Sequence, residues 1–214
     1  MIIGISDGVG MTNIINDKNL KEAQDHYKNF YCKHSKILLE DWKRCDWKIC
    51  KTTGDGLFFY SENNVGIDYS NYLQSIIALY HEINDDTQPS RLFVYACDSS
   101  KIVKGSAIED DNIKSFIEND LFGHELNLGF RLLGLASGPF LFTEDKFLEK
   151  IYKDEVSENP KKQFRESGFT YTPIPITFLK GIKEIGFRSK TYIDAITNET
   201  KQKKPRWIWQ IQKN

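Results

Sequence analysis

The sequence predicts an α+β fold, a ferredoxin-like sandwich in which helices pack on a mainly antiparallel sheet. The order of elements supports this, because a strand, a helix, a hairpin, a helix and a strand follow one another. A third helix and further strands come after them. The 214 residues suit one domain with a substantial core, so we expect a single domain over residues 1–214.

The elements of the first half follow from apolar runs and helical periodicity. Residues 1–7 predict a short buried strand that ends at Asp7. Residues 19–44 place apolar side chains at the spacing of a long amphipathic helix. In residues 46–61, strand-like residues flank a Gly-Asp-Gly segment, and Gly and Asp tolerate the positive φ of a tight turn. We therefore expect a hairpin that turns at residues 54–56.

The rest of the chain has similar patterns. They predict, in order, a helix over 70–84, a strand over 90–97, a helix over 124–137, a strand over 139–143, a helix from Glu144, a polar loop over 153–163 and strands over 176–181, 190–196 and 206–212. We expect Phe58, Phe59 and Tyr60 to belong to the sheet core. Trp207 and Trp209 alternate as same-face strand residues do, which indicates a core or interface position.

The composition excludes several classes of protein. The net charge of −1 argues against a general nucleic-acid binder, which usually carries a basic excess. No apolar run has membrane-spanning length, and the N-terminus lacks the layout of a signal peptide. The four cysteines contain no C-x-x-C pair, so neither zinc nor a disulfide framework is indicated. We expect a reduced, cytoplasmic protein with neither a nucleic-acid nor a membrane partner.

Two acidic residues stand where strands end. Asp7 closes the first strand, and Asp55 lies at the hairpin tip, so their carboxylates could meet across neighbouring strands. Two carboxylates among oxygen ligands suit Mg²⁺, which also binds substrate phosphates. The glycine-containing turn after Asp7 can aim backbone N–H groups at phosphates. The plainer alternatives are a turn-capping role for Asp7 and an ordinary surface hairpin around Asp55.

A third segment places Asn127 and Arg131 four residues apart, on one face of a helix that begins after Gly123. The alternative for Arg131 is an ordinary solvated helix residue. Together the three segments resemble the class III nucleotidyl cyclases, the adenylate and guanylate cyclase catalytic domains. The matching residues are Asp7-Gly-Val-Gly-Met-Thr12, Lys51-Thr-Thr-Gly-Asp55 and Asp120-Leu-Phe-Gly-His-Glu-Leu-Asn127-Leu-Gly-Phe-Arg131-Leu. They keep the family's internal spacings and cover most of the chain in order.

The chain also departs from the family pattern. Gly8 and Met11 stand where the family has Ile and Phe, and Gly129 stands where it has Ala. The strand over 90–97 leads into an acidic loop instead of a Thr-Gly pair. These departures indicate a divergent member that retains the chemical residues.

The resemblance implies an enzyme that converts a nucleoside triphosphate into a 3′,5′-cyclic nucleotide and pyrophosphate. It implies that Asp7 and Asp55, with the Gly8 carbonyl, bind two Mg²⁺ or Mn²⁺ ions. One ion lowers the pKa of the ribose 3′-OH, which attacks the α-phosphate, and the other holds the triphosphate. Asn127 would hold the ribose, and Arg131 would stabilise charge developing on the α-phosphate.

The remaining contacts implied by the resemblance concern the phosphates and the base. Phosphate contacts are implied for Gly8, Val9, Gly10, Met11, Thr12 and a late lysine, Lys180. The Lys180 match is a single Lys-Gly pair, so an ordinary surface lysine is the alternative. Lys51 and Asp120 would read the base edge. The family shares each site between two chains, so we expect a homodimer with active sites at its interface.

The identity of the base stays open. A Lys/Asp pair marks adenine in the family, but cytosine presents the same edge, and uracil could accept from Lys51 and donate to Asp120. The hydrogen bonds therefore argue against guanine more than against pyrimidines, and ring size would have to discriminate among the rest. ATP and a pyrimidine triphosphate, UTP or CTP, are therefore both candidates. The bare catalytic domain resembles the stand-alone cyclases of bacterial Pycsar antiphage systems, which make cyclic UMP or cyclic CMP.

Two other classes of function remain as alternatives. The segment "GDGLFFY" faintly resembles the aromatic RNA-binding strand of an RRM, which would indicate a nucleic-acid-binding ferredoxin-like module. A catalytically dead cyclase-like subunit that only dimerises is the other. Retention of both aspartates, Asn127 and Arg131 on one chain argues against it.

Overall fold

The computed structural model describes residues 1–16, 18–40, 44–62, 67–84, 89–110, 112–134, 138–152, 169–174 and 208–213. The strands in these segments are β1 (Ile2–Gly8), β2 (Lys48–Thr52), β3 (Gly56–Ser61), β4 (Ser90–Ala96), β5 (Val103–Lys104), β6 (Leu121–Phe122), β7 (Leu141–Glu144), β8 (Phe169–Ile174) and β9 (Ile208–Lys213). The helices there are α1 (Met11–Asn16), α2 (Leu20–Leu38), α3 (Tyr69–Ile83), α4 (Lys114–Ile117), α5 (His124–Leu133) and α6 (Asp145–Tyr152).

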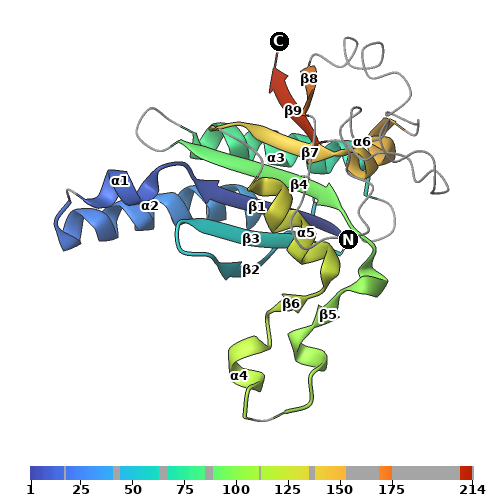
Figure 1. Ribbon diagram of the computed structural model, residues 1–214, viewed down its shortest axis with the longest axis horizontal. Coiled ribbons are helices and arrows are strands. Elements are labelled where there is room, and N and C mark those ends of the chain that lie inside the picture. Colours follow the sequence, from blue (N-terminus) through green and yellow to red (C-terminus); the bar gives the residue numbers. More distant parts are fainter. Residues whose placement is uncertain are drawn as a thin grey trace, which may run out of the picture.

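The main sheet has seven strands in the order β2-β3-β1-β4-β7-β9-β8 (Figure 1). β1 pairs antiparallel with both β3 and β4, and β2 pairs antiparallel with β3. With α2 and α3 as crossovers, these strands form a ferredoxin-like βαββαβ unit. β7 extends the sheet parallel to β4, and β9 and β8 continue it antiparallel. The predicted α+β fold with a mainly antiparallel sheet is confirmed.

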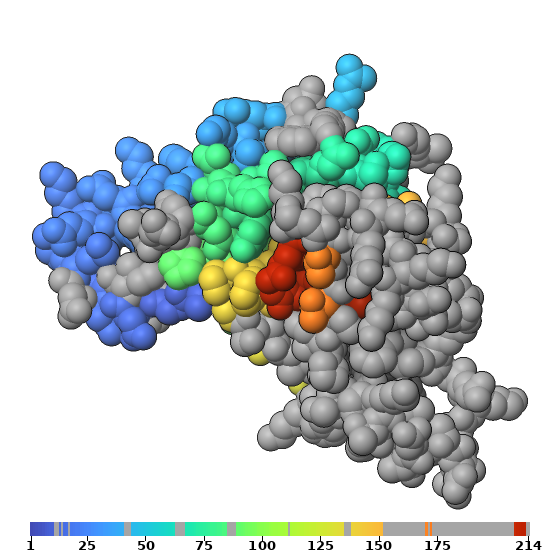
Figure 2. Space-filling model, turned by 90° about the horizontal axis from the view of Figure 1, so that it is seen from above, coloured from blue at the N-terminus to red at the C-terminus, as the bar shows by residue number. Residues whose placement is uncertain are grey.

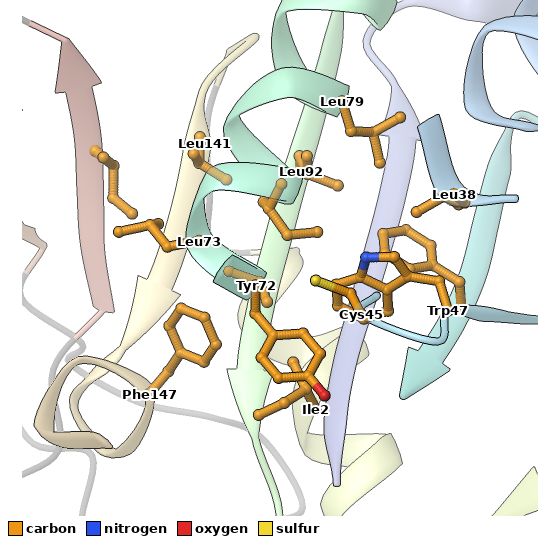
Figure 3. Packing of buried hydrophobic residues seen from close by; sticks show 14 of the residues in the cluster. Ile2, Leu38, Cys45, Trp47, Tyr72, Leu73, Leu79, Leu92, Leu141 and Phe147 are labelled. Carbon is orange, nitrogen blue, oxygen red and sulfur yellow. The ribbon is translucent and has the colours of Figure 1, made fainter. Parts of the chain in front are cut away.

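Side chains alternate across each strand, so the sheet has a core on each face. One core joins Ile2 of β1 to α3, and Figure 3 shows Leu73 and Leu79 of that helix on the same side of the sheet as Leu92 of β4. The other core joins Ile3 to the apolar side chains of α5. Seen from above, the blue N-terminal segments gather at one end, and red β9 lies beside orange β8 (Figure 2). Helices therefore cover both faces of the strands that carry the predicted site.

The long helix predicted over residues 19–44 is shorter in the structure. α2 begins with a capping box between Asn19 and Glu22 and ends at Leu38. Further along the chain, Arg44 and Asp46 adopt positive φ values of 56° and 48°, which a continuing helix excludes. The chain turns because Trp47 is buried in the first core, where its Nε1–H donates to Ser75 Oγ at 2.8 Å.

Several elements were absent from the sequence prediction. They are α1, β8 and an arm, which we define as residues 98–123 with β5, α4 and β6. Figure 1 shows the arm extending away from the main sheet. β8 was missed because it contains Pro173, which only an edge strand tolerates. The expected strands over 176–181 and 190–196, the loop over 153–163, Lys180 and Trp207 lie outside the described residues.

The predicted core aromatics lie where expected. Phe58 and Phe59 are fully buried, Trp209 is buried and Tyr60 is half-buried. All four cysteines fall in described segments, and none forms a disulfide. None of the helices in the described ranges has the length and apolar character that crossing a bilayer demands.

Candidate functional site

Asp7 and Asp55 come together at one end of the sheet. Asp7 lies opposite Gly56 in the β1–β3 register. The hairpin is closed by the Thr53 N–H, which donates to the Gly56 carbonyl at 2.9 Å, and Gly54 has a φ of 84°. The Gly8 N–H donates to the Asp55 carbonyl at 2.8 Å, which ties the hairpin tip to the end of β1. The predicted approach of the two strand ends is therefore present.

The electrostatics of the pair fit a cation site. Partial burial raises the pKa of the Asp55 carboxyl, and the charge of Asp7 and a side-chain hydrogen bond with it raise that pKa further. A divalent cation between the two carboxylates would relieve this repulsion, and phosphates and water would complete an oxygen shell. Within the described ranges, no group of three or more His, Cys, Asp and Glu side chains could hold a metal ion.

Arg91 supplies the counter-charge in this structure. It lies on β4 directly opposite Asp7, and its Nε donates to Asp7 Oδ2 at 2.7 Å. The guanidinium also lowers the pKa of Asp55, against the larger upward effects. Sequence analysis did not identify Arg91. The available signal was a basic residue at the start of a strand whose neighbour in the sheet ends in an acid.

A hollow of about 200 Å³ opens beside Asp7. Its lining residues come from β1, the hairpin, β4 and the C-terminal end of α5, namely Ile5, Ser6, Asp7, Thr53, Arg91, Phe130, Leu133 and Gly134. A larger hollow of about 330 Å³ lies between α3 and β9 and contains no predicted site residue. The hollow beside Asp7 is the one that adjoins the acidic pair.

Two N–H groups of the turn after Asp7 already donate hydrogen bonds within the protein. The N–H groups of Gly8 and Val9 donate to the carbonyls of Asp55 and Pro89, both at 2.8 Å. Gly10 has a φ of 71°, a conformation that favours glycine, and α1 begins at the next residue. The hydrogen bonds of Gly8 and Val9 thus attach the turn to the segments that contain Asp55 and Pro89. Gly10 is the last residue before α1.

The structure also brings Lys51 and Asp120 together. Lys51 Nζ lies 3.0 Å from Asp120 Oδ2 and 5.9 Å from the centroid of the Phe122 ring. Lys51 belongs to β2, whereas Asp120 immediately precedes β6 at the base of the arm. The Gly105 N–H donates a hydrogen bond to the Asp120 carbonyl at 2.7 Å. A cation, a carboxylate and an aromatic ring therefore share one partly exposed position, which suits recognition of a planar polar edge.

Asn127 and Arg131 are both exposed on α5, whereas Leu128 and Leu132 are buried beneath the helix. Neither Asn127 nor Arg131 lines the hollow beside Asp7, although other α5 residues do. The departure at Gly129 has a steric reason. A Cβ there would lie 2.3 Å from the Tyr95 hydroxyl, which donates to the Glu125 carbonyl.

The aromatic segment gives no support to an RNA-binding role. Phe58 and Phe59 are fully buried in the two cores, so their rings have no accessible face on which a base could stack. Phe58 and Phe59 therefore cannot serve as the base-stacking aromatics of an RRM.

Comparison with known proteins identifies the fold. No model of a known protein family matches the chain, and no curated protein matches it in sequence. Solved structures do match. The adenylyl cyclase CyaB from P. aeruginosa is 13% identical with a TM-score of 0.62, covering 100% of this chain and 93% of that one.

Two fungal structures give similar values. The guanylate cyclase domain of RhGC from Catenaria anguillulae, in complex with GTP, is 11% identical with a TM-score of 0.60, covering 99% of this chain and 95% of that one. A non-canonical dimeric guanylyl cyclase domain of the RhoGC fusion protein from Blastocladiella emersonii is 12% identical with a TM-score of 0.60, covering 99% of this chain and 93% of that one. The chain therefore shares the fold of these cyclase domains.

Proposed function

We propose that the protein is a nucleotide cyclase of the class III type. It converts a nucleoside triphosphate into a 3′,5′-cyclic nucleotide and pyrophosphate. The observation that carries this proposal is the approach of Asp7 and Asp55 at the end of β1, within a fold shared with adenylyl and guanylyl cyclase domains. The fold alone would not suffice, because one fold hosts many functions.

In this proposal each side chain has the role that the resemblance to class III cyclases implies. Two Mg²⁺ or Mn²⁺ ions held by Asp7 and Asp55 would acidify the ribose 3′-OH and neutralise the triphosphate. The 3′-OH gives its proton to solvent water as its oxygen bonds to the α-phosphorus. The bond from that phosphorus to the bridging oxygen breaks, and pyrophosphate leaves with the electron pair. Asn127 orients the ribose, and the Arg131 guanidinium stabilises the charge that develops on the α-phosphate.

The proposed enzyme is a homodimer with two sites at its interface. Asn127 and Arg131 are exposed and lie outside the lining of the hollow beside Asp7, so one chain does not assemble the full set there. A symmetric dimer would place these two residues opposite the carboxylates of the partner, twice over. Its two sites would be equivalent.

The Lys51–Asp120 pair selects the base in this proposal. It presents a donor and an acceptor side by side at 3.0 Å, which matches the edges of adenine and cytosine and can also meet uracil. Guanine presents the opposite polarity to adenine and cytosine, and the size of its ring system would separate it from uracil, which shares that polarity. The proposed substrate is therefore ATP or a pyrimidine triphosphate. A pyrimidine product, cyclic UMP or cyclic CMP, would act as a signal in bacterial antiphage defence.

The test incubates the purified protein with each of the four nucleoside triphosphates and Mn²⁺, and identifies products by mass spectrometry. We expect a cyclic nucleotide from ATP, UTP or CTP, with kcat/KM for GTP at least about 10²-fold lower, because the bound base would enclose a polar mismatch with Lys51 and Asp120. Asp55→Asn abolishes turnover, whereas Asp25→Asn on the exposed face of α2 leaves it unchanged. Absence of any cyclic product, or GTP as the best substrate, contradicts the corresponding part of the proposal.

A further inference from the structure

We propose that α2 clamps the two metal-binding strand ends, with Tyr31 and His34 as positioning residues that fix the separation of Asp7 and Asp55. The consequence for metal binding rests on the proposed function. The clamp itself rests on hydrogen bonds that run from one helix to both carboxylate-bearing segments. Tyr31 and His34 are three residues apart in α2, so they project from the same side of the helix.

Tyr31 holds the hairpin. Its hydroxyl donates to the Gly54 carbonyl at 2.7 Å, directly before Asp55. Partial burial raises the pKa of the Tyr31 hydroxyl, and the nearby charge of Asp55 also raises it. The Tyr31 ring is itself fixed by an edge contact with Phe30 at 5.3 Å between centroids. The turn that carries Asp55 therefore has an anchor outside its own backbone.

His34 holds the end of β1. Its Nδ1 lies 2.8 Å from the Phe30 carbonyl, which can only accept, so Nδ1 carries the proton. Its Nε2 lies 2.7 Å from Ser6 Oγ and accepts the Ser6 hydroxyl proton. Ser6 Oγ in turn accepts the Leu57 N–H at 3.2 Å. One chain of hydrogen bonds thus links α2 to the residue before Asp7 and to β3 just beyond Asp55.

The burial of this network makes it rigid. His34 and Ser6 are fully buried, so water cannot replace a missing partner, and an unpaired polar group there is costly. Gly56 lets β3 approach β1 closely, because a Cβ at that position would lie 2.4 Å from the Ser6 carbonyl. The two strand ends are in tight contact, and α2 fixes both from one side.

The experiment compares Tyr31→Phe and His34→Gln with two control variants on the same helix. Tyr27→Phe alters a ring that stacks on Tyr31, and Ser35→Ala removes a hydroxyl that bonds within α2. We measure the Mn²⁺ dissociation constant by electron paramagnetic resonance and the hydrogen exchange of the amides of residues 52–58 by mass spectrometry. Both are read independently of turnover.

We expect Tyr31→Phe and His34→Gln to weaken Mn²⁺ binding by about 2- to 10-fold, the effect of losing one hydrogen bond, and to speed exchange in the hairpin. Tyr27→Phe and Ser35→Ala change neither. At saturating Mn²⁺, kcat of Tyr31→Phe stays within about 2-fold of the wild type, because a positioning defect is compensated by mass action. A general loss of structure would instead lower kcat at every Mn²⁺ concentration.

Two outcomes separate this inference from the proposed function. If Asp55→Asn binds Mn²⁺ as tightly as the wild type, the assignment of Asp55 as a metal ligand fails. The hydrogen exchange of residues 52–58 then decides by itself whether α2 fixes the hairpin. If Tyr31→Phe matches Tyr27→Phe in both measurements, the clamp is overturned. The Tyr31 hydrogen bond is solvent-exposed, so its removal does not endanger folding. If His34→Gln does not fold, Ser6→Ala removes the same link with a smaller change in volume.

Discussion

Asp7 and Arg91 lie opposite each other on β1 and β4, and the Arg91 guanidinium is hydrogen-bonded to the Asp7 carboxylate at 2.7 Å. Both side chains are about three-quarters buried, with exposed fractions of 23% and 27%. The ion pair stands beside a second carboxylate, Asp55, whose pKa is raised by burial and by Asp7. Arg91 therefore places a positive charge beside these two carboxylates and offsets part of their mutual repulsion.

Replacing Arg91 should make the protein depend on a divalent cation for stability. Arg91→Gln removes a charged hydrogen bond, and we expect a loss of about 1–2 kcal/mol in the free energy of unfolding without metal. Mn²⁺ should then raise the Tm of Arg91→Gln by more than that of the wild type, because it relieves a repulsion that Arg91 otherwise offsets. Thermal unfolding with and without Mn²⁺ measures both effects.

The matched control for Arg91→Gln is Lys36→Gln. Lys36 forms a surface pair with Glu82 at 2.9 Å, and such exposed pairs add little to stability. Lys36→Gln should show the same Mn²⁺ response as the wild type. An equal response from Arg91→Gln would contradict the proposed balance of charges.

The shared site predicts that two inactive variants restore one another. Asp55→Asn removes a metal ligand, and Arg131→Ala removes the guanidinium that acts on the transition state. A mixed dimer holds one intact site and one doubly damaged site, so co-expression should return activity that neither variant has alone. Activity is measured on heterodimers isolated with two affinity tags. Inactive heterodimers would show that each chain builds its own site.

His34 predicts a pH dependence of stability. Burial lowers the pKa of His34 from 6.5 to about 4, although its bond to Phe30 opposes this. In the unfolded chain, the His34 imidazole therefore becomes protonated as the pH falls through 6.5. In the folded protein, it stays neutral until the pH falls to about 4. The contribution of neutral His34 to the free energy of unfolding is fully present above pH 6.5. About 2 kcal/mol of this contribution should be lost between pH 7 and pH 5.

Denaturant unfolding of the wild type and His34→Gln at each pH isolates this effect from other titrating groups. The difference between the two proteins should shrink as the pH falls from 7 to 5, because glutamine has no proton to gain. A difference that stays constant over this range would show that His34 does not titrate as its burial requires.

Gly129 predicts a steric cost in α5. In Gly129→Ala, the new Cβ would lie 2.3 Å from the Tyr95 hydroxyl, so the ring or the helix must shift. We expect a loss of about 1–3 kcal/mol in the free energy of unfolding, as for other overpacked cores. Gly134→Ala is the control, since its nearest neighbour lies at 3.3 Å and its φ is −63°. Equal stability of the two variants would contradict the close Tyr95 contact.

The sequence by itself determined the fold class, the hairpin around Asp55, and the likeness that singled out Asp7 and Asp55. These features are local: the turn depends on Gly54, and each strand or helix repeats its own period. The resemblance also implied that Lys51 and Asp120 meet the same base edge, and the structure brings these side chains within 3.0 Å of each other. Their roles in binding a base remain predictions.

Only the tertiary structure decided what surrounds the two carboxylates. Arg91 meets Asp7 across 84 positions of the chain, and His34 meets Ser6 across 28. No local pattern encodes such contacts, because they depend on strand register and on where a helix crosses the sheet. The same reason explains the end of α2, which stops because Trp47 must return to the core rather than because a helix-breaking residue follows Leu38.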